Sequence, residues 1–421
     1  MSSHDPPAPL SLTPTVMSKM KAAKVFKTAV EPSAPLSPGH SGRSPQAQQG
    51  PRHITGLSFD DRGDQVITAG EDETFRLYNC KTGKRVLFVL RTLLAWTNAP
   101  SSPRRPYSCY RQIKILYSKK YGVDLPRFTH KNSAIVYAST KEDDTIRYHA
   151  LHDNKYLQYF KGHKDRVISL EMSPTDDGFM SGSLDKTVRV WDLRSPSCRG
   201  ILNLPASPVV AYDQNGVVFA VGMNQYSRIL LYDISNFDKA PFLIITLEDP
   251  SLARITYPPR AIFMTSLSFS TNGKYILVGC SGDAHYIVDS FTGYLVAKLE
   301  GHKGLERRRL DAQITIEPTK GCSGEEVSWT PDSKFIVSGS LDGRICVWDV
   351  SNLPPQENPK AEVKPMLPTM VLEGHPGPAR CVKFNPRLAM LASAGAELAF
   401  WLPDTSGEPG DLAKELLKKP S

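Results

Sequence analysis

The chain has 421 residues, 40% of them hydrophobic and 22% charged, and its 29 glycines and 34 prolines suit short strands joined by frequent turns. The seven cysteines are scattered and form no C-x-x-C pair, which disfavours a secreted disulfide framework and favours a reducing, intracellular compartment. The first 27 residues lack the apolar core of a signal peptide, and the longest apolar run is too short to span a bilayer. We therefore expect a soluble protein without a membrane segment.

The formal net charge of +8 is concentrated in one part of the sequence. Nine lysines and arginines, and no acidic residue, lie between Lys84 and Lys120, which leaves the rest of the chain close to neutral. A surface that reads nucleic acid spreads its positive charge over the folded domain. We therefore expect no direct sequence-specific binding of nucleic acid.

The two ends of the chain have no repeat pattern. Residues 1–20 are rich in proline and serine and are expected to be disordered, and residues 405–421 are expected to form a C-terminal tail. One short β-type run, 23–27, precedes the first repeat.

Between these ends the sequence repeats itself. Residues 173–192 and 330–349 both read as turn, strand, tight turn and strand, and each places an Asp six residues before a Trp. The same frame recurs at Asp143, which lies 42 residues before Asp185, and Gly-His pairs stand in register with it. A period of about 40–45 residues with these signatures is typical of the four-stranded blade of a WD40 β-propeller.

Seven sets of strands follow from these frames, at about 52–118, 121–160, 163–204, 206–247, 262–300, 323–372 and 376–402. The last set has only three strands, and an open sheet edge would invite aggregation. The spare strand at 23–27 is therefore expected to close the ring. This predicts an all-β fold, a seven-bladed WD40 β-propeller over residues 21–404, with insertions near 32–51, 85–112, 249–260, 303–321 and 352–366.

Residues 85–112 do not continue the repeat. An apolar run is followed by Pro-Ser-Ser-Pro-Arg-Arg-Pro, and the stretch contains no acidic residue. Two interpretations stay open: a native basic loop that binds a partner, such as a phosphorylated polymerase tail or RNA, or non-native sequence such as a translated intron.

A buried chain of polar side chains is predicted inside the repeats. Its members are His163, Ser181, Ser183, Asp185 and Trp191, with Asp342 and Trp348 in the second repeat. Asp185 can accept a hydrogen bond from His163, the imidazole can hold Ser181 or Ser183, and Trp191 is expected to receive the last bond. A satisfied chain of this kind stabilises a blade, and we prefer this role to a hydrolase triad.

Catalytic signatures are absent from the sequence. It contains no phosphate-binding loop, dinucleotide fingerprint, zinc-protease helix or nucleophile elbow, and no His or Cys cluster with zinc spacing. No acidic or metal-binding cluster is expected at the central channel. We therefore expect neither an enzyme nor a bound cofactor or metal.

Two features favour binding of other proteins. The residue just before each turn aspartate is a candidate contact on one rim of the propeller; these residues are Glu71, Glu142, Leu184 and Leu341. The alternative for the leucines is packing against a neighbouring turn. In addition, Trp191-Asp192-Leu193-Arg194 resembles the W-D-x-R box through which some WD40 proteins dock onto cullin-ring ubiquitin ligases, which would make Arg194 a contact of a substrate receptor.

Several stretches resemble one particular family. They are 119–125, 143–148, 151–156, 183–196, 237–242, 384–386 and 399–403. Together they are similar to the fungal type of the WD-repeat subunit shared by the COMPASS histone H3 lysine methyltransferase complex and the cleavage-and-polyadenylation machinery. The resemblance implies a nuclear, non-catalytic adaptor whose partners are subunits of both assemblies, with a link to RNA polymerase II and to transcription termination.

Overall fold

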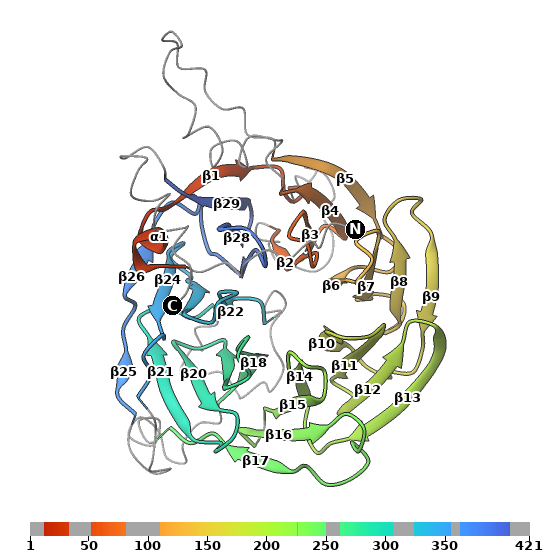
Figure 1. The fold of residues 1–421 in the computed structure, drawn as a ribbon. Coiled ribbons are helices and arrows are strands. Elements are labelled where there is room, and N and C mark those ends of the chain that lie inside the picture. Colours follow the sequence, from red (N-terminus) through yellow and green to blue (C-terminus); the bar gives the residue numbers. More distant parts are fainter. Residues whose placement is uncertain are drawn as a thin grey trace, which may run out of the picture.

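The computed structural model describes residues 12–32, 52–80, 110–224, 226–249, 262–305, 324–354 and 363–404. These residues form seven sheets arranged as blades around a central axis (Figure 1). Six sheets have four antiparallel strands, and the fifth blade adds a short parallel strand to its four. The prediction of an all-β, seven-bladed propeller is therefore confirmed. None of the helices in the described ranges is long and apolar enough to cross a membrane.

Blades 1 to 4 follow one another along the chain, each from its inner to its outer strand. Their strands are β2 (Ile54–Phe59), β3 (Gln65–Gly70), β4 (Thr74–Asn79) and β5 (Arg111–Tyr117); β6 (Asp124–Phe128), β7 (Ala134–Ala138), β8 (Ile146–Ala150) and β9 (Tyr156–Phe160); β10 (Val167–Met172), β11 (Gly178–Ser183), β12 (Thr187–Asp192) and β13 (Ser195–Asn203); and β14 (Pro208–Tyr212), β15 (Val218–Met223), β16 (Arg228–Asp233) and β17 (Leu243–Thr246).

In blades 5 to 7 the outermost strand does not directly follow the strand beside it in the chain. Their strands are β18 (Met264–Phe269), β19 (Tyr275–Cys280), β20 (Ala284–Asp289), β21 (Leu295–Glu300) and β25 (Pro365–Met366); β22 (Val327–Trp329), β23 (Phe335–Gly339), β24 (Ile345–Asp349) and β26 (Met370–Leu372); and β27 (Cys381–Phe384), β28 (Leu391–Ala394), β29 (Leu398–Pro403) and β1 (Met20–Phe26).

The burial of each strand explains its sequence pattern. The second strand of a blade is covered on both faces by neighbouring blades, so β7 is a continuous apolar run, AIVYA, with every residue buried. The outer strand has one face toward solvent, so β9 alternates between exposed and partly buried residues. Three fully buried tryptophans, Trp191, Trp348 and Trp401, fill the space between blades.

The ring closes through the N-terminal part of the chain. Strand β1 pairs antiparallel with β29, from Met20 opposite Pro403 to Phe26 opposite Leu398, and becomes the outer strand of blade 7. The predicted closure is thus present, with a strand that begins earlier than residue 23.

The prediction of disorder over 1–20 is wrong for residues 12–20. A short helix, α1 (Pro14–Ser18), begins after Thr13, whose hydroxyl accepts a hydrogen bond from the Val16 N–H, with proline at the start of the helix. The side chains of Leu12, Val16 and Met17 are buried in the same cluster as Phe335 of blade 6 and Trp401 of blade 7. Apolar residues spaced along one helical turn therefore anchor this segment against two blades.

Most residues of the predicted insertions, and the tail at 405–421, lie outside the described residues. Two boundaries need correction. Arg111 and Gln112 belong to β5, where they pair with Asn79 and Tyr78, and Tyr110 is buried in the core. The insertion predicted at 85–112 therefore does not include its last three residues. Likewise, β25, at the end of the insertion predicted at 352–366, pairs in parallel with β21 of blade 5.

Candidate partner-binding surfaces

The side chains of blade 3 form a continuous polar chain. The Trp191 Nε1–H donates to Ser181 Oγ at 2.8 Å, Ser181 Oγ lies 2.7 Å from His163 Nε2, and His163 Nδ1 lies 3.0 Å from Asp185 Oδ2. An imidazole with its proton on Nδ1 donates to the carboxylate and accepts from the serine. Trp191 is therefore the donor at the end of the chain and not, as predicted, the acceptor.

Ser183 takes no place in this chain. Its hydroxyl donates to the Asp165 carbonyl at 2.8 Å and accepts from the Asp185 N–H at 3.1 Å, so it fixes the tight turn itself. Burial acts to raise the pKa of Asp185, but hydrogen bonds from Thr187, the Lys164 N–H and His163 outweigh it and hold that pKa at about 2. The carboxylate therefore stays ionised throughout the neutral range.

Blade 6 replaces this chain with another arrangement. Asp342 accepts two hydrogen bonds from Arg344, at 2.9 and 2.6 Å, and Trp348 donates to the carbonyls of Glu300 and Met366. Ser338 of blade 6 corresponds to Ser181 of blade 3. Its hydroxyl oxygen lies 2.9 Å from Nε2 of His285, which belongs to blade 5. The prediction that Asp342 and Trp348 repeat the blade 3 chain is therefore wrong, because arginine stands two residues after Asp342 where blade 3 has Thr187.

We expect Asp185→Ala to lower the free energy of unfolding by roughly 1–3 kcal/mol, because it leaves buried His163 without its acceptor. The matched change Glu142→Ala removes an exposed carboxylate and should shift that free energy by no more than about 0.5 kcal/mol. Urea unfolding of both variants measures the difference. Equal losses at the two sites would rule out a stabilising polar chain.

Three of the four predicted rim residues occupy equivalent places. The backbone N–H groups of Glu71, Leu184 and Leu341 donate to a carbonyl of the loop that enters their blade, at 2.9, 2.9 and 3.0 Å. All three side chains are partly buried, and the Glu71 carboxylate also accepts from the His53 N–H at 2.9 Å. Glu142 differs: it is exposed in a longer turn and has a positive φ of 64°. The prediction that Glu142 holds the same place in blade 2 is therefore wrong.

Arg194 lies at the surface and pairs with Asp192, which belongs to the same W-D-x-R motif. Its guanidinium donates to both oxygens of Asp192, at 3.0 and 2.9 Å, while its side chain is 73% exposed. The Asp192 hydrogen bond raises the pKa of Arg194, which stays charged. A partner that binds this guanidinium would compete with Asp192.

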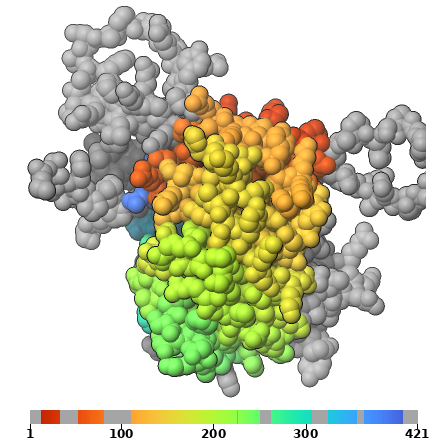
Figure 2. Space-filling model, turned by 90° about the vertical axis from the view of Figure 1, so that its right-hand side faces the viewer, coloured from red at the N-terminus to blue at the C-terminus, as the bar shows by residue number. Residues whose placement is uncertain are grey.

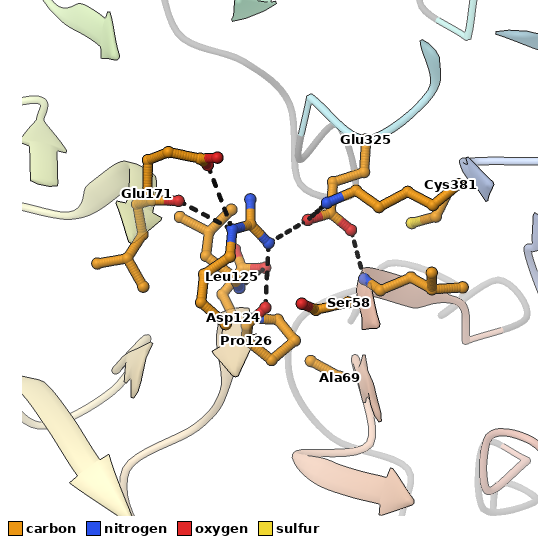
Figure 3. A network of polar contacts seen from close by, with 12 residues as sticks. Ser58, Ala69, Asp124, Leu125, Pro126, Glu171, Glu325 and Cys381 are labelled. Carbon is orange, nitrogen blue, oxygen red and sulfur yellow. Dashed lines mark hydrogen bonds and ion pairs between the residues drawn. The ribbon is translucent and has the colours of Figure 1, made fainter. Parts of the chain in front are cut away.

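A network of charged side chains crosses the central channel (Figure 3). Glu325, just before β22, accepts hydrogen bonds from the Leu57 N–H of blade 1 and from the Arg127 guanidinium of blade 2. Lys383 of blade 7 approaches the same carboxylate at 3.4 Å. Arg127 Nε donates in turn to the Leu170 carbonyl of blade 3 at 2.9 Å. The inner strands expose unpaired backbone N–H and C=O groups at the channel, and Glu325 and Arg127 form hydrogen bonds with two of them. Through these contacts and the Lys383 ion pair, blades 1, 2, 3 and 7 are connected to blade 6.

Sequence reasoning missed this network of paired charges. The sequence feature that could have predicted it is a charged residue in or beside an apolar inner strand, as at Glu325 and at Arg127. The network lines a cavity of about 610 Å³ whose three acidic residues are Asp61, Glu171 and Glu325. Each of the three is paired with a histidine, arginine or lysine. The arrangement can hold the blades around the channel together.

Metal binding has no support in the described ranges, where no group of three or more His, Cys, Asp or Glu side chains is placed to hold an ion. The free cysteines Cys80 and Cys280 are buried, and burial raises the pKa of both thiols. A thiol held in its protonated form is a poor nucleophile and a poor metal ligand.

We expect Glu325→Ala to cost roughly 3–5 kcal/mol of unfolding free energy, because it leaves the mostly buried Arg127 guanidinium without its closest partner. Glu171→Ala is the matched control: Glu171 also faces Arg127, but at 3.6 Å and with 44% of its side chain exposed, so its loss should cost at most about 1 kcal/mol. Thermal and urea unfolding measure both variants. A Glu325 variant as stable as the Glu171 variant would contradict the bridging role.

Comparison with known proteins adds independent evidence. The model of the family described as WD domain, G-beta repeat matches residues 43–79, 154–192 and 325–349. WD repeat-containing protein 82 of Drosophila melanogaster is 40% identical over 353 residues, which cover 83% of this chain and 90% of that protein. Set1 complex component swd2 of Schizosaccharomyces pombe is 33% identical over 83% of this chain and 92% of its own length. COMPASS component SWD2 of Saccharomyces cerevisiae is 31% identical, with 83% and 91% covered.

Proposed function

This chain belongs to the WD40-repeat family that includes WD repeat-containing protein 82 and Swd2, and on that premise we propose that it is a non-catalytic adaptor subunit of a COMPASS-type histone H3 lysine-4 methyltransferase complex in the nucleus. One observation carries the proposal. Two fungal relatives named as components of the Set1 complex and of COMPASS match this chain over 92% and 91% of their own length. The likeness therefore extends over the whole propeller and is not confined to a few generic repeats.

The shape of the molecule supports a scaffolding role. The seven blades offer separate outer strands around one rigid ring, and large apolar side chains are exposed on several of them: Leu157 (50%), Ile201 (47%) and Ile244 (56%). Side chains exposed on these outer strands are available for contact with partner subunits. A ring of this kind can hold more than one partner at a time.

We extend the proposal to a second assembly. The stretches that resemble the shared subunit imply a link to the cleavage-and-polyadenylation machinery, to the RNA polymerase II tail and to transcription termination. In this reading the same propeller serves two complexes, and residues on the tight-turn rim are the candidate contacts for one of them.

Affinity purification of the full chain with mass spectrometry tests the proposal. We expect subunits of a histone methyltransferase complex, together with polyadenylation factors. Recovery of cullin-ring adaptors without either set would overturn it in favour of a ubiquitin-ligase receptor. Leu184→Glu combined with Leu341→Glu should lose one set of partners at unchanged melting temperature, whereas Arg194→Glu, the control, should keep both sets.

A further inference from the structure

Two basic segments that are far apart in the sequence lie on neighbouring outer strands. Residues 19–27 contain four lysines and no acidic residue, and residues 111–122 contain one arginine, three lysines and no acidic residue. The first segment includes β1, the outer strand of blade 7, and the second includes β5, the outer strand of blade 1 (Figure 1). Phe26 of β1 packs against blade 1, since its ring lies 4.8 Å from that of Tyr78 in β4, whose backbone pairs with Gln112 of β5.

Six of these cations are exposed and form no ion pair with any described residue. Lys19 directly follows α1, which packs against blades 6 and 7. We call the other five the basic edge; they are Lys24, Lys27, Arg111, Lys119 and Lys120. Figure 2 shows β5 and the loop after it, in orange, at the molecular surface beside red N-terminal residues. Charge that is scattered in the sequence is thus gathered along one side of the ring, and an unpaired, hydrated cation is available to an external anion.

The acidic residues near the basic edge already have partners. Glu31 accepts a hydrogen bond from the Tyr117 hydroxyl at 3.1 Å, Asp404 pairs with Lys21 at 2.7 Å, and Glu73 pairs with Lys141. The two ion pairs neutralise Asp404 and Glu73 without using a cation of the basic edge. The Tyr117 hydroxyl is neutral, so Glu31 keeps its charge and subtracts one negative charge from the five positive charges of the basic edge.

Aromatic rings alternate with the cations. Lys119 Nζ lies 5.2 Å from the centre of the Tyr117 ring, and Lys120 Nζ lies 5.1 Å from that of Tyr121. The Tyr117 side chain is 52% exposed, so one face of the ring is open to a stacking partner. Cations that follow a backbone, next to rings on which bases stack, are the features of surfaces that bind single-stranded nucleic acid.

We propose that the basic edge binds single-stranded nucleic acid through its phosphates, without sequence specificity, and that Tyr117 stacks on a base. The outer side of a propeller is convex, so a flexible single strand can follow it. In the part of the chain that the structure describes, this side has no helix or two-stranded ribbon that projects to enter a duplex groove. This activity goes beyond an adaptor role and does not depend on it, because the purified chain alone should show it.

Fluorescence anisotropy with labelled oligouridylate of about 20 nucleotides tests the proposal. Five phosphate contacts predict that affinity falls about 100-fold between 50 and 200 mM salt, because single strands lose affinity with a slope of about −0.7 per contact. Reversal of four charges, Lys24→Glu, Lys27→Glu, Lys119→Glu and Lys120→Glu, leaves one contact and should reduce this salt effect to about threefold. The pair Lys119→Glu and Lys120→Glu, which leaves β1 intact, serves if the fourfold variant does not fold.

The matched control reverses four exposed lysines elsewhere: Lys161, Lys164, Lys239 and Lys274. It changes the net charge by the same amount, so the proposal requires it to keep the affinity and salt dependence of the unmodified chain. Tyr117→Leu should weaken binding about fivefold or more while the salt dependence stays unchanged, because stacking carries no charge.

Four results would overturn the proposal, and the first three concern the oligonucleotide and its variants. They are absence of oligonucleotide binding at 50 mM salt, equal loss in the basic-edge and control variants, and binding of a phosphorylated peptide without binding of the oligonucleotide. The last result would assign the basic edge to an acidic protein segment. Stronger binding of duplex than of single strands would also contradict the proposed geometry.

Discussion

A chain that begins at residue 28 is expected to lose cooperative unfolding and to aggregate. This deletion removes β1, so that β29 becomes an open edge, and it also removes the buried side chains of Leu12, Val16, Met17 and Met20. Burial of one such side chain contributes about 1.5–3 kcal/mol, so the four together contribute roughly 6–12 kcal/mol. That sum is comparable with the whole stability of a typical domain. Size-exclusion chromatography and thermal unfolding measure the effect.

Two shorter deletions separate the causes. Removal of residues 1–11 takes away none of these four side chains and should leave the melting temperature unchanged. Removal of residues 1–19 keeps the closing strand but loses three of the four, so it should lower the melting temperature while the protein stays monomeric. A chain from residue 28 that remains monomeric and melts like the full chain would show that blade 7 does not need β1.

The blades could be predicted because local pattern and long-range topology agree. A turn, an apolar run and a second tight turn recur at a fixed period, and each blade buries its faces against its neighbours. Helix α1 could not be predicted in this way. Its five residues follow a proline-rich stretch, and only the gap between blades 6 and 7 makes Val16 and Met17 core residues. A single turn of helix is too short to be stable without such packing.

The candidate site could be predicted only in part, for a related reason. The blade 3 chain depends on residues close in sequence, from His163 to Trp191. The contacts of His163 with Asp185 and with a serine were expected, whereas the Trp191 hydrogen bond was predicted in the opposite direction. In blade 6 the corresponding serine is taken by His285, which comes from the preceding blade. Glu325 likewise contacts strands from blades 1, 2 and 7. Contacts between blades depend on which side chains meet across the ring, and no periodic pattern encodes them.

Acid is expected to destabilise the protein well above the range in which carboxylates titrate. Burial lowers the pKa of six histidines below the ordinary imidazole value of about 6.5; they are His53, His149, His163, His285, His302 and His375. His285 shows the cause. Its Nδ1 accepts a hydrogen bond from the Cys280 N–H at 3.1 Å, its Nε2 donates to Ser338, and its ring stacks on that of His302 with the ring centres 4.2 Å apart. A proton added at Nδ1 would therefore have no acceptor, and the positive charge would face another imidazole.

The direction of the effect follows from proton uptake. Below pH 6.5 the unfolded chain binds protons on these histidines that the folded chain does not bind, so the free energy of unfolding decreases as the pH falls, by about 1.4 kcal/mol per pH unit for each proton taken up. Above about pH 7.5 neither state is protonated and the curve should be flat. His130 acts in the opposite direction, because the hydrogen bond to Asp61 raises its pKa, but this pair is largely exposed and its effect is small.

Urea unfolding between pH 8 and pH 5 measures this dependence, with the interval from pH 8 to pH 7.5 as the internal reference. His130→Gln removes the one histidine in the described ranges whose pKa is raised, so it should leave the steep decrease below pH 6.5 in place. A free energy of unfolding that stays constant from pH 7 to pH 5.5 would mean that the buried imidazoles accept protons in the folded ring. The packing of His285 against His302 would then have to open without unfolding a blade.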